Sequence, residues 1–527
     1  MNLKIMVGFS FKNTLTQVTA VAILSAFFPG AASAVIAQKT NILWVWVDDQ
    51  HPWYGTYGDM LVQTPNIDNL ADTGAVFERA YAPAPVCSTS RSAIATGSYP
   101  IRIGAHDHRS GRIPENQIYL PANVKTVPTL FLEAGYETYN DGKDDFNFSY
   151  NRSDLYSLPK NPIITSEKTH LQQKTRAAKS QSKKFENKGN FRLDRGDGHW
   201  SEIPAGVSFF GQTSISGGKG DGSTLAPRLK SLGYTPVKSR DVRVPKQYPA
   251  IPEVREKIAG HYNSILQTDH ELGFLIQSLK EDGRWEDTII FLFSDHGSNL
   301  PRSKEFCYEE GLHVPLIISG PGAQGKITPG TRRKDLVNLF DITATALSLA
   351  GLEIPSFMDS KDVFADDYER DYVFSSADRM SNVIDRVRSV MGDRYHYIRN
   401  FMTDRPLFNW GYREFFAADF PDKFGYFLKI RDLATTGKLT PAQAAPYGPR
   451  SAEELYDLKN DPDEVVNLAG NPKHRKALEE MRIQLKRWIK DTDDKGQYPR
   501  SSASLAEVMG RFPRSALKSP EYRVYNP

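Results

Sequence analysis

The sequence predicts an α/β fold in which a large, mainly parallel sheet is sandwiched by helices and followed by a smaller C-terminal α+β subdomain. Two continuous apolar runs, at residues 40–47 and 288–293, have the composition of strands buried on both faces. Helical patterns alternate with such strands over residues 40–351, which is typical of a parallel sheet. The expected organisation has four parts: a signal peptide at 1–34, an α/β domain at 40–374, a C-terminal subdomain at 375–500 and a tail at 501–527.

The elements between these landmarks follow from the spacing of apolar residues and from the turn residues at their ends. Residues 255–280 carry apolar side chains at helical spacing, and residues 472–492 form an amphipathic pattern. Residues 166–198 are polar with little periodicity, which predicts a long surface excursion. The remaining expected elements are helices at 64–71, 127–133 and 336–350, strands at 135–140, 207–211 and 314–318, and a hairpin at 389–399.

Composition narrows the class of protein. The chain has 527 residues, of which 39% are hydrophobic and 24% are charged, and these fractions are ordinary for a globular protein. Because the net charge is only +3, we expect no nucleic-acid partner. Two cysteines, Cys87 and Cys307, exclude a disulfide framework, and the single bridge they could form would consume the thiol of Cys87.

The first 34 residues have the pattern of a secretory signal. Lys4 and Lys12 supply positive charge, residues 18–28 form an apolar run too short to span a bilayer, and Ala32-Ser33-Ala34 is a small-residue cleavage site. A membrane anchor is the alternative interpretation of this run. No other run approaches 18 apolar residues. We therefore expect a periplasmic or secreted protein whose mature form has no membrane span.

Metal-ligating side chains follow both buried strands. Asp48 and Asp49 come directly after residues 40–47, and Asp295 and His296 come soon after residues 288–293. Because ligands of open α/β sheets bind at the carboxyl ends of the strands, we expect these four side chains to converge. Three carboxylates in one crevice predict a site for a hard divalent cation. A solvated turn is the alternative for the Asp48–Asp49 pair taken alone.

The segment Cys87-Ser88-Thr89-Ser90-Arg91 joins a loop of Pro and small residues to the start of a helix. We expect the hydroxyls of Ser88, Thr89 and Ser90 to cap the first helical turn. The helix N-terminus and Arg91 favour negative charge on Cys87, which suits a nucleophile or an oxyanion-binding group. The alternative is a buried cysteine that fills a gap in the core.

This pentapeptide resembles the Cys-x-Pro-Ser-Arg signature of type I sulfatases, a family of the alkaline phosphatase superfamily, with Thr89 in the usual place of Pro. The resemblance extends over residues 41–468 and implies an alkaline phosphatase-like fold. It also implies that a formylglycine-generating maturation enzyme converts Cys87 to formylglycine, whose hydrated aldehyde is the nucleophile. The metal ligands that it implies are Asp48, Asp49, the modified Cys87, Asp295 and His296. The implied ion is Ca²⁺, although an imidazole ligand leaves Mg²⁺ and Mn²⁺ open.

The resemblance also implies cations around the nucleophile. Arg91 belongs to the signature itself, Lys143 follows Gly142 as in the family's Gly-Lys motif, and Lys304 matches the lysine that binds sulfate in relatives. Positive side chains suit this place because the substrate is anionic and charge builds up on its leaving oxygen. Solvated surface lysines are the alternative interpretation of Lys143 and Lys304.

The chain departs from the family pattern at two further places. Asp145 stands where many sulfatases have a histidine two residues after the Gly-Lys lysine, and Gly218-Lys219 replaces a Pro-His pair. Lys219 is therefore a candidate for binding the substrate anion or for protonating the leaving group. His106 and His108 are candidate substitutes for the missing acid and base, with purely structural histidines as the equal alternative.

The sequence thus predicts a secreted sulfuric ester hydrolase, a sulfatase, that acts on a sulfated polysaccharide or oligosaccharide. Two alternatives stay open. One is a phosphate or phosphonate ester hydrolase of the same superfamily, which would use the same metal and the same lysines. The other is a non-catalytic protein that binds sulfated glycans, an interpretation prompted by the departures at Thr89, Asp145 and Lys219.

Overall fold

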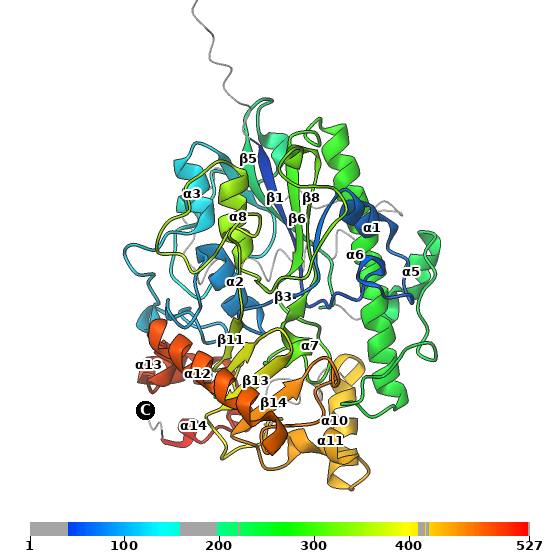
Figure 1. Ribbon diagram of the computed structural model, residues 1–527, viewed down its shortest axis with the longest axis vertical. Helices are drawn as coiled ribbons and strands as arrows, with labels where there is room; N and C mark the ends of the chain where they lie inside the picture. The colour runs from blue at the N-terminus through cyan, green and yellow to red at the C-terminus, as the bar shows by residue number, and fades with distance from the viewer. Residues whose placement is uncertain (1–39, 159–197, 220–221, 409–416, 418–420, 525–527) are drawn as a thin grey trace, which may run out of the picture. The chain divides into compact units, whose positions relative to one another are not determined.

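A computed structural model describes residues 40–158, 198–219, 222–408, 417 and 421–524 (Figure 1). The expected signal peptide and nearly all of the polar stretch 166–198 lie outside these residues. The chain from Lys39 to Pro527 forms one compact unit. Within its described part, we find no helix that combines the length and the apolar character needed to cross a membrane.

The central sheet has seven strands, and the prediction of a mainly parallel sheet is confirmed. Their order across the sheet is β4 (Glu137–Asn140), β5 (Phe209–Ile215), β1 (Asn41–Val47), β6 (Thr288–Ser294), β8 (Leu316–Ser319), β2 (Gly74–Phe77) and β9 (Thr331–Arg333). All neighbours pair in parallel except that β8 runs antiparallel to both β6 and β2. The expected strand at 314–318 therefore runs against the other strands of the sheet.

Pro315 divides that expected strand in two, because proline has no N–H for a ladder. Its first part, β7 (His313–Val314), belongs instead to a small sheet of order β10-β3-β7, with β10 (Val337–Asn338) and β3 (Ala80–Tyr81). The helix expected at 336–350 is correspondingly shorter: α8 covers Asp341–Leu349 and follows β10.

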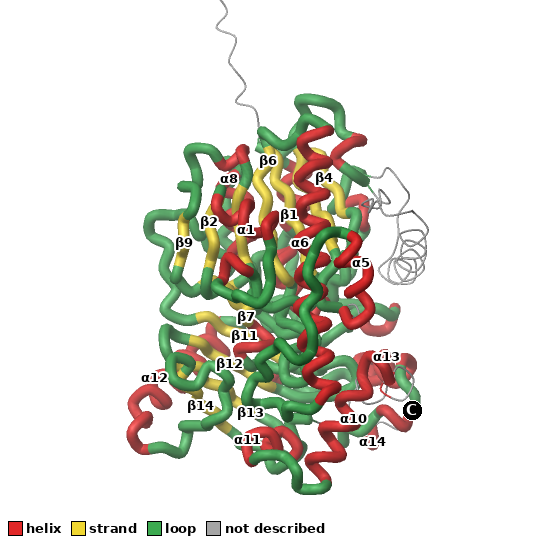
Figure 2. Tube along the Cα trace, turned by 90° about the vertical axis from the view of Figure 1, so that its right-hand side faces the viewer, coloured by secondary structure: helices red, strands yellow, loops and turns green. Residues whose placement is uncertain are grey.

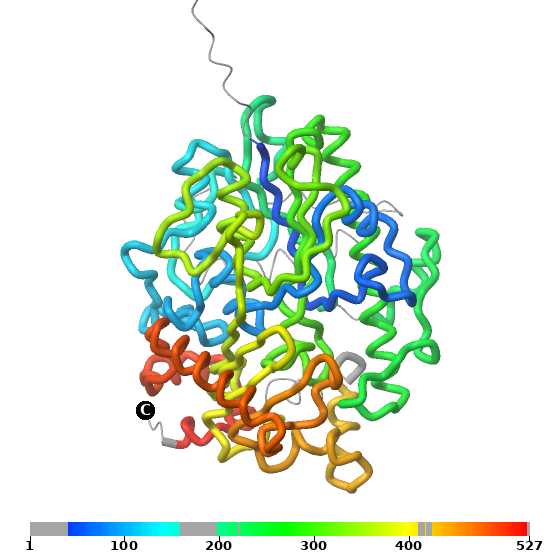
Figure 3. The backbone as a smooth tube through the Cα atoms, viewed as in Figure 1, coloured from blue at the N-terminus to red at the C-terminus, as the bar shows by residue number. Residues whose placement is uncertain are grey.

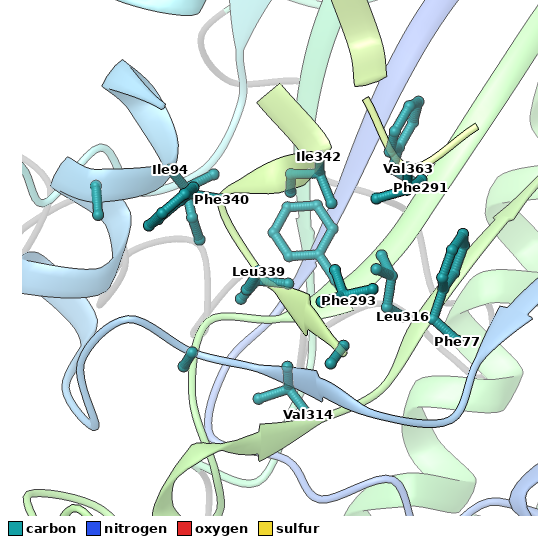
Figure 4. Packing of buried hydrophobic residues seen from close by; sticks show 14 of the residues in the cluster. Phe77, Ile94, Phe291, Phe293, Val314, Leu316, Leu339, Phe340, Ile342 and Val363 are labelled. Carbon is teal, nitrogen blue, oxygen red and sulfur yellow. The ribbon is translucent and has the colours of Figure 1, made fainter. Parts of the chain in front are cut away.

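Helices cover both faces of the central sheet (Figure 2). The period-two alternation of β1 sends Trp44 and Trp46 into one core and Leu43 and Val45 into the other. The first face carries α8, α2 (Cys87–Thr96) and α3 (Val127–Glu133), and the second carries α1 (Pro65–Asp72), α5 (Ala226–Ser231) and the long α6 (Pro252–Glu281). Figure 4 shows part of the first core, where Phe291 and Phe293 of β6 lie near Ile342 of α8.

A second sheet lies in the C-terminal part (Figure 1). It is antiparallel, in the order β11 (Val373–Ala377), β12 (Val387–Met391), β13 (Tyr395–Asn400) and β14 (Glu453–Asp457), so the expected hairpin is confirmed. The amphipathic α12 (Arg475–Asp491) buries Leu478 and Trp488 in the first core. The expected boundary at 374/375 falls inside β11, and the division into domains stays a prediction. The described residues also form the α-helices α7 (Glu309–Leu312), α10 (Pro421–Thr435), α11 (Pro441–Ala444), α13 (Ser502–Arg511) and α14 (Glu521–Val524).

Candidate active site

The carboxyl ends of β1 and β6 meet beside α2 (Figure 1). Val47 and Ser294 are partners in the parallel register, so the residues that follow them leave the sheet side by side. The N–H of Asp49 donates to a carboxylate oxygen of Asp295 at 3.2 Å, and the N–H of Asp295 donates to the carbonyl of Val47 at 3.2 Å. The structure therefore brings together the acidic residues that follow these two strands, as the topology of a parallel sheet requires.

Cys87 is the first residue of α2, which places its side chain at the positive end of the helix. Its Sγ lies 3.2 Å from Nε2 of His296. The prediction that Ser88, Thr89 and Ser90 cap the first turn is wrong. The helix begins earlier, at Cys87, and its N-cap residue, Val86, makes no side-chain hydrogen bond. The hydroxyls serve other purposes: Ser90 donates to the carbonyl of Asp295 at 2.6 Å, and Ser88 accepts the N–H of Arg109 at 2.9 Å. The first bond fixes the start of α2 against the strand end, and the second connects it to the loop that follows the helix.

Four side chains have the geometry of a metal site. The ligand atoms of Asp49, Cys87, Asp295 and His296 all lie within 4.8 Å of one another, and all four residues are buried. Carboxylates buried this closely together repel each other unless a cation lies between them. The donor set of two carboxylates, an imidazole and the group at position 87 therefore fits a divalent cation.

Asp48 lies outside that group of four, although the sequence assigned it to the metal. Its carboxylate instead accepts from Arg91 at 2.6 Å, and it lies 3.4 Å from both Lys143 and Lys219. Asp48 thus connects three cations to the strand end. A direct role of Asp48 as a ligand stays a prediction.

Three cations surround Cys87, at the positions that the sequence indicated. Arg91 bridges Asp48 and Asp295, and its guanidinium stacks 4.1 Å from the ring centroid of Trp46. Lys304 donates to both carboxylate oxygens of Asp49, at 2.8 and 2.9 Å, and to the Sγ of Cys87 at 3.3 Å. Lys143 lies 3.9 Å from Asp295 as well as near Asp48.

The charges of these cations shift the pKa values of the groups around them. Burial alone would raise the pKa of Cys87, but the nearby Lys143 and Lys304 outweigh it and lower the pKa to about 7. The pKa of Asp48 and that of Asp49 also fall below the usual range, because lysines overcome the effect of burial. The site therefore holds ionised carboxylates and stabilises an anion at position 87.

The Gly217-Gly218 pair allows a third chain segment to pass close to the acids. A Cβ at Gly217 would lie 2.0 Å from the carbonyl oxygen of Asp48, and one at Gly218 would lie 2.0 Å from that of Asp49. Both positions consequently require glycine for steric reasons. The pair delivers Lys219 to the site, where its Nζ lies 3.4 Å from Asp48.

The structure does not place the two candidate histidines in contact with Cys87. His108 is buried, its Nδ1 lies 3.0 Å from the hydroxyl of Ser381, and burial holds its pKa well below the usual value. The Nδ1 of His106 has no hydrogen-bond partner among the described residues. A neutral, buried His108 is poorly suited to donate a proton, so its role and that of His106 stay predictions.

Asp145, which departs from the histidine that the resemblance to sulfatases implies, forms ion pairs. Its buried carboxylate lies 2.7 Å from Arg112, 3.4 Å from Lys143 and 3.9 Å from Arg109. These cations overcome the effect of burial and hold its pKa well below the usual range. Asp145 therefore acts as a shared anion for a site lysine and two arginines.

Sequence reasoning missed a buried polar network behind Asp49. Gln50 donates to Thr268 at 2.8 Å and accepts from Tyr54 at 2.7 Å, so both ends of its amide are held. His261 lies beside it, and burial lowers its pKa to about 3. The signal was available, because His261 is a polar residue on the apolar face of the helix expected at 255–280.

Left-handed backbone is also concentrated at the site. In the part of the chain that the structure describes, seven residues other than glycine have a positive φ, and five of them lie at or beside the site. Such conformations cost free energy and persist where surrounding contacts impose them, often for function. The five are Asp49, Arg109, Asp145, Glu305 and Ser381.

An anion-stabilising cysteine beside clustered carboxylates and lysines, at the carboxyl edge of a parallel sheet, defines a hydrolase of anionic esters. Comparison with known proteins identifies the family. The Sulfatase family model matches residues 40–185 and 167–352. The chain belongs to the sulfatase family of the alkaline phosphatase superfamily and is a sulfuric ester hydrolase.

Two relatives show how far the similarity extends. An ulvan-active sulfatase of Formosa agariphila is 30% identical over 519 residues, which cover 94% of this chain and 82% of that protein. Human N-sulphoglucosamine sulphohydrolase is 26% identical over 486 residues, which cover 87% of this chain and 91% of that enzyme. The similarity therefore includes both the central sheet and the C-terminal part.

Solved structures share the fold at lower identity. A 2-O GAG sulfatase superposes with a TM-score of 0.57 at 20% identity, and covers 88% of this chain and 94% of its own. A phosphonate monoester hydrolase of Agrobacterium radiobacter superposes equally well, with a TM-score of 0.58 at 17% identity over 86% of this chain and 96% of its own. The fold alone thus does not separate sulfate from phosphonate chemistry.

Proposed function

We propose that this sulfatase removes sulfate from a sulfated polysaccharide or oligosaccharide, with a formylglycine made from Cys87 as its nucleophile. One observation carries the proposal: the Sγ of Cys87 lies at the N-terminus of α2 within 3.3 Å of both Lys304 and His296. The carbohydrate substrate is supported by relatives whose names specify ulvan and sulphoglucosamine.

Formylglycine, once formed, supplies a hydrated aldehyde whose hydroxyl can attack sulfur. The surroundings of position 87 support negative charge there, because Lys143 and Lys304 outweigh burial in setting the pKa of the cysteine. The same lysines are suited to hold the sulfate oxygens, since Lys304 extends to within 3.3 Å of the reacting position. The N-terminus of α2, where position 87 lies, adds a further preference for an anion.

A divalent metal would be held by Asp49, Asp295, His296 and the group at position 87. Such an ion supplies Lewis-acid charge that favours the deprotonated nucleophile and offsets the charge of the sulfate. We propose Ca²⁺, with Mg²⁺ and Mn²⁺ as the alternatives that an imidazole ligand leaves open.

Lys219 is best suited to bind the substrate anion. Although burial opposes it, the carboxylate of Asp48 holds the pKa of Lys219 well above the usual value. A lysine that keeps its proton this firmly is a poor proton donor to a leaving group. Its side chain is 42% exposed, so a substrate can reach it.

The proposed setting is outside the cytoplasm. Residues 1–34 have the pattern of a secretory signal, and sulfated polysaccharides are too large to enter a cell unaided. The proposal therefore includes a periplasmic or secreted enzyme, matured by a formylglycine-generating enzyme of its host.

Mass spectrometry of the peptide across Cys87, in protein purified from its native host, tests the nucleophile. The expected mass is that of a peptide in which an aldehyde replaces the CH₂–SH group. An unmodified Cys87 together with retained glycan binding and no turnover would instead support a non-catalytic glycan-binding protein.

Rates on paired aryl esters test which group the nucleophile attacks: sulfate, phosphate or phosphonate. We expect the matured protein to hydrolyse 4-nitrophenyl sulfate faster than 4-nitrophenyl phosphate or a phenyl phosphonate. The similarity of the fold to phosphonate monoester hydrolases makes the phosphonate the necessary comparison. A preference for phosphate or phosphonate would overturn the proposed substrate class.

A further inference from the structure

A second group of cations lies beside the lysines of the site. It comprises four arginines, which we call the arginine cluster: Arg109, Arg112, Arg379 and Arg511. Arg109 and Arg112 come from the loop after α2, Arg379 follows β11, and Arg511 ends α13. Nothing in the proposed chemistry at position 87 uses this cluster.

The C-terminal segment builds the cluster onto the active site. In Figure 3 the red end of the chain lies close to blue segments that precede it by hundreds of residues. Glu507 of α13 accepts the N–H groups of Gly111 and Arg112 at 3.2 and 2.9 Å, and Arg511 donates to the carbonyl of Arg109 at 3.1 Å. The N–H of Arg109 in turn donates to Ser88, the neighbour of Cys87. A continuous series of hydrogen bonds thus connects α13 to the start of α2.

Two of the described carboxylates of the cluster are each shared among several cations, and a third, Glu507, lies 3.5 Å from Arg511 and also accepts two backbone N–H groups. Asp145 forms ion pairs with Arg109, Arg112 and Lys143. Asp107 forms ion pairs with Arg379 and Arg500. Arg379 is fully buried, and its Nη2 has no hydrogen-bond partner among the described residues. The incompletely paired guanidinium of Arg379 therefore adds buried positive charge to the cluster, which an anion at the exposed side can offset.

The charge around Arg511 and the backbone conformation of Arg109 also indicate a binding site. Burial is the main cause that lowers the pKa of Arg511 to about 10, and the neighbouring Arg379, Arg112 and Arg109 lower it further against the opposing charge of Glu507. Arg109 itself has left-handed backbone, with φ of 54°. A strained arginine held among other arginines is more consistent with binding than with stability.

We propose that the arginine cluster binds a second anionic group of the substrate, a carboxylate or another sulfate, while the scissile sulfate lies at Lys143 and Lys304. This inference rests on the proposed sulfatase function and specifies its substrate as a sugar unit with at least two negative charges. The side chains of Arg109 and Arg511 are 23% and 29% exposed and touch the ligand, whereas the buried Arg112 and Arg379 contribute charge from behind. Guanidinium groups suit this role because their planar fork binds carboxylate and sulfate with two hydrogen bonds.

Competition against 4-nitrophenyl sulfate tests the proposal without requiring the natural substrate. The competitors are ulvan and heparin oligosaccharides of one size, each in three forms: native, with carboxylates reduced to alcohols, and partly desulfated. We expect the native form of at least one glycan to inhibit about tenfold more strongly than one of its modified forms, since a charge-assisted pair lost at a partly buried site costs about one such factor. Weaker inhibition after carboxylate reduction identifies a carboxylate as the second group, whereas weaker inhibition after partial desulfation identifies a second sulfate only where the difference depends on Arg109 and Arg511.

The variants Arg109→Gln and Arg511→Gln should reduce this preference to less than about threefold. The readout is a ratio of two inhibition constants for one protein, so a general loss of activity does not affect it. Arg511→Lys should retain part of the preference, and Arg475→Gln, at a surface arginine that is 78% exposed, should retain all of it.

Equal inhibition by all three forms of both glycans would overturn the proposal, as would a preference that survives both glutamine variants. Hydrolysis of 4-nitrophenyl sulfate by the wild type in the same assay shows that the sulfatase function itself is intact. The two failures are therefore distinguishable.

Discussion

Replacing Asp145 with asparagine tests whether this residue positions Lys143. The carboxylate lies 2.7 Å from Arg112, whose side chain is 7% exposed, so the substitution leaves a buried guanidinium without its main anion. Removing one partner of such a buried pair costs roughly 3–5 kcal/mol, and we expect about 3 kcal/mol because asparagine keeps one acceptor. Lys143 and Arg109 are each about one-fifth exposed, so solvent screening makes their share small.

The same substitution should lower kcat/KM for 4-nitrophenyl sulfate about tenfold, which corresponds to about 1.4 kcal/mol, because Lys143 loses one of the carboxylates that orient it. Urea unfolding measures the first effect and steady-state kinetics per folded molecule measures the second. Asp341→Asn is the matched control, since Asp341 is a buried partner of Arg370 in the core. If both variants lose stability and neither loses kcat/KM, the positioning role of Asp145 is wrong.

Three further outcomes are expected. Gly217→Ala should lower kcat/KM at least tenfold and cost roughly 1–3 kcal/mol of stability. The reason is that the added Cβ would lie 2.0 Å from the carbonyl oxygen of Asp48. Gly470→Ala is the control and should be neutral in both assays, because no atom lies within 4 Å of its added Cβ. EDTA should abolish turnover, and separate addition of Ca²⁺, Mg²⁺ and Mn²⁺ should show which ion restores it; full activity in EDTA would exclude the metal. Burial raises the pKa of Glu310 from 4.5 to about 7, so the folded state holds a proton that the unfolded state releases. Stability should therefore fall by about 3 kcal/mol as pH rises through this interval, and urea titrations of Glu310→Gln should show a flatter dependence.

The central sheet was predictable because its strands carry their own signal. β1 and β6 are continuous apolar runs, and such runs occur where both faces of a strand are covered. The direction of β8 was not predictable in this way, since an apolar strand has the same composition whether it runs parallel or antiparallel. Pro315 was the sequence feature that indicated a break in the expected strand, because it separates β7 from β8, which belong to two different sheets.

Some residues of the candidate site were likewise predictable from the sequence, and others were not. Asp49, Asp295 and His296 were predictable because each comes soon after a buried strand, so topology alone brings them to one edge. Arg112 and Arg511 were not, because they are far apart in the sequence and meet only through the packing of α13 on the loop after α2. Residues that act through tertiary packing leave no local pattern, and only the folded chain identifies them.

One of the departures from the family pattern, Asp145, has a physical explanation. A histidine at position 145 could be neutral, whereas the aspartate there is an obligatory anion, and its pKa stays well below the usual range. A fixed negative charge at this place permits two arginines to lie beside Lys143 without mutual repulsion driving them apart. Asp145, Arg109 and Arg112 are therefore one feature, in which the aspartate supplies the charge that lets the site hold additional cations, as the proposed binding of a second anionic group requires.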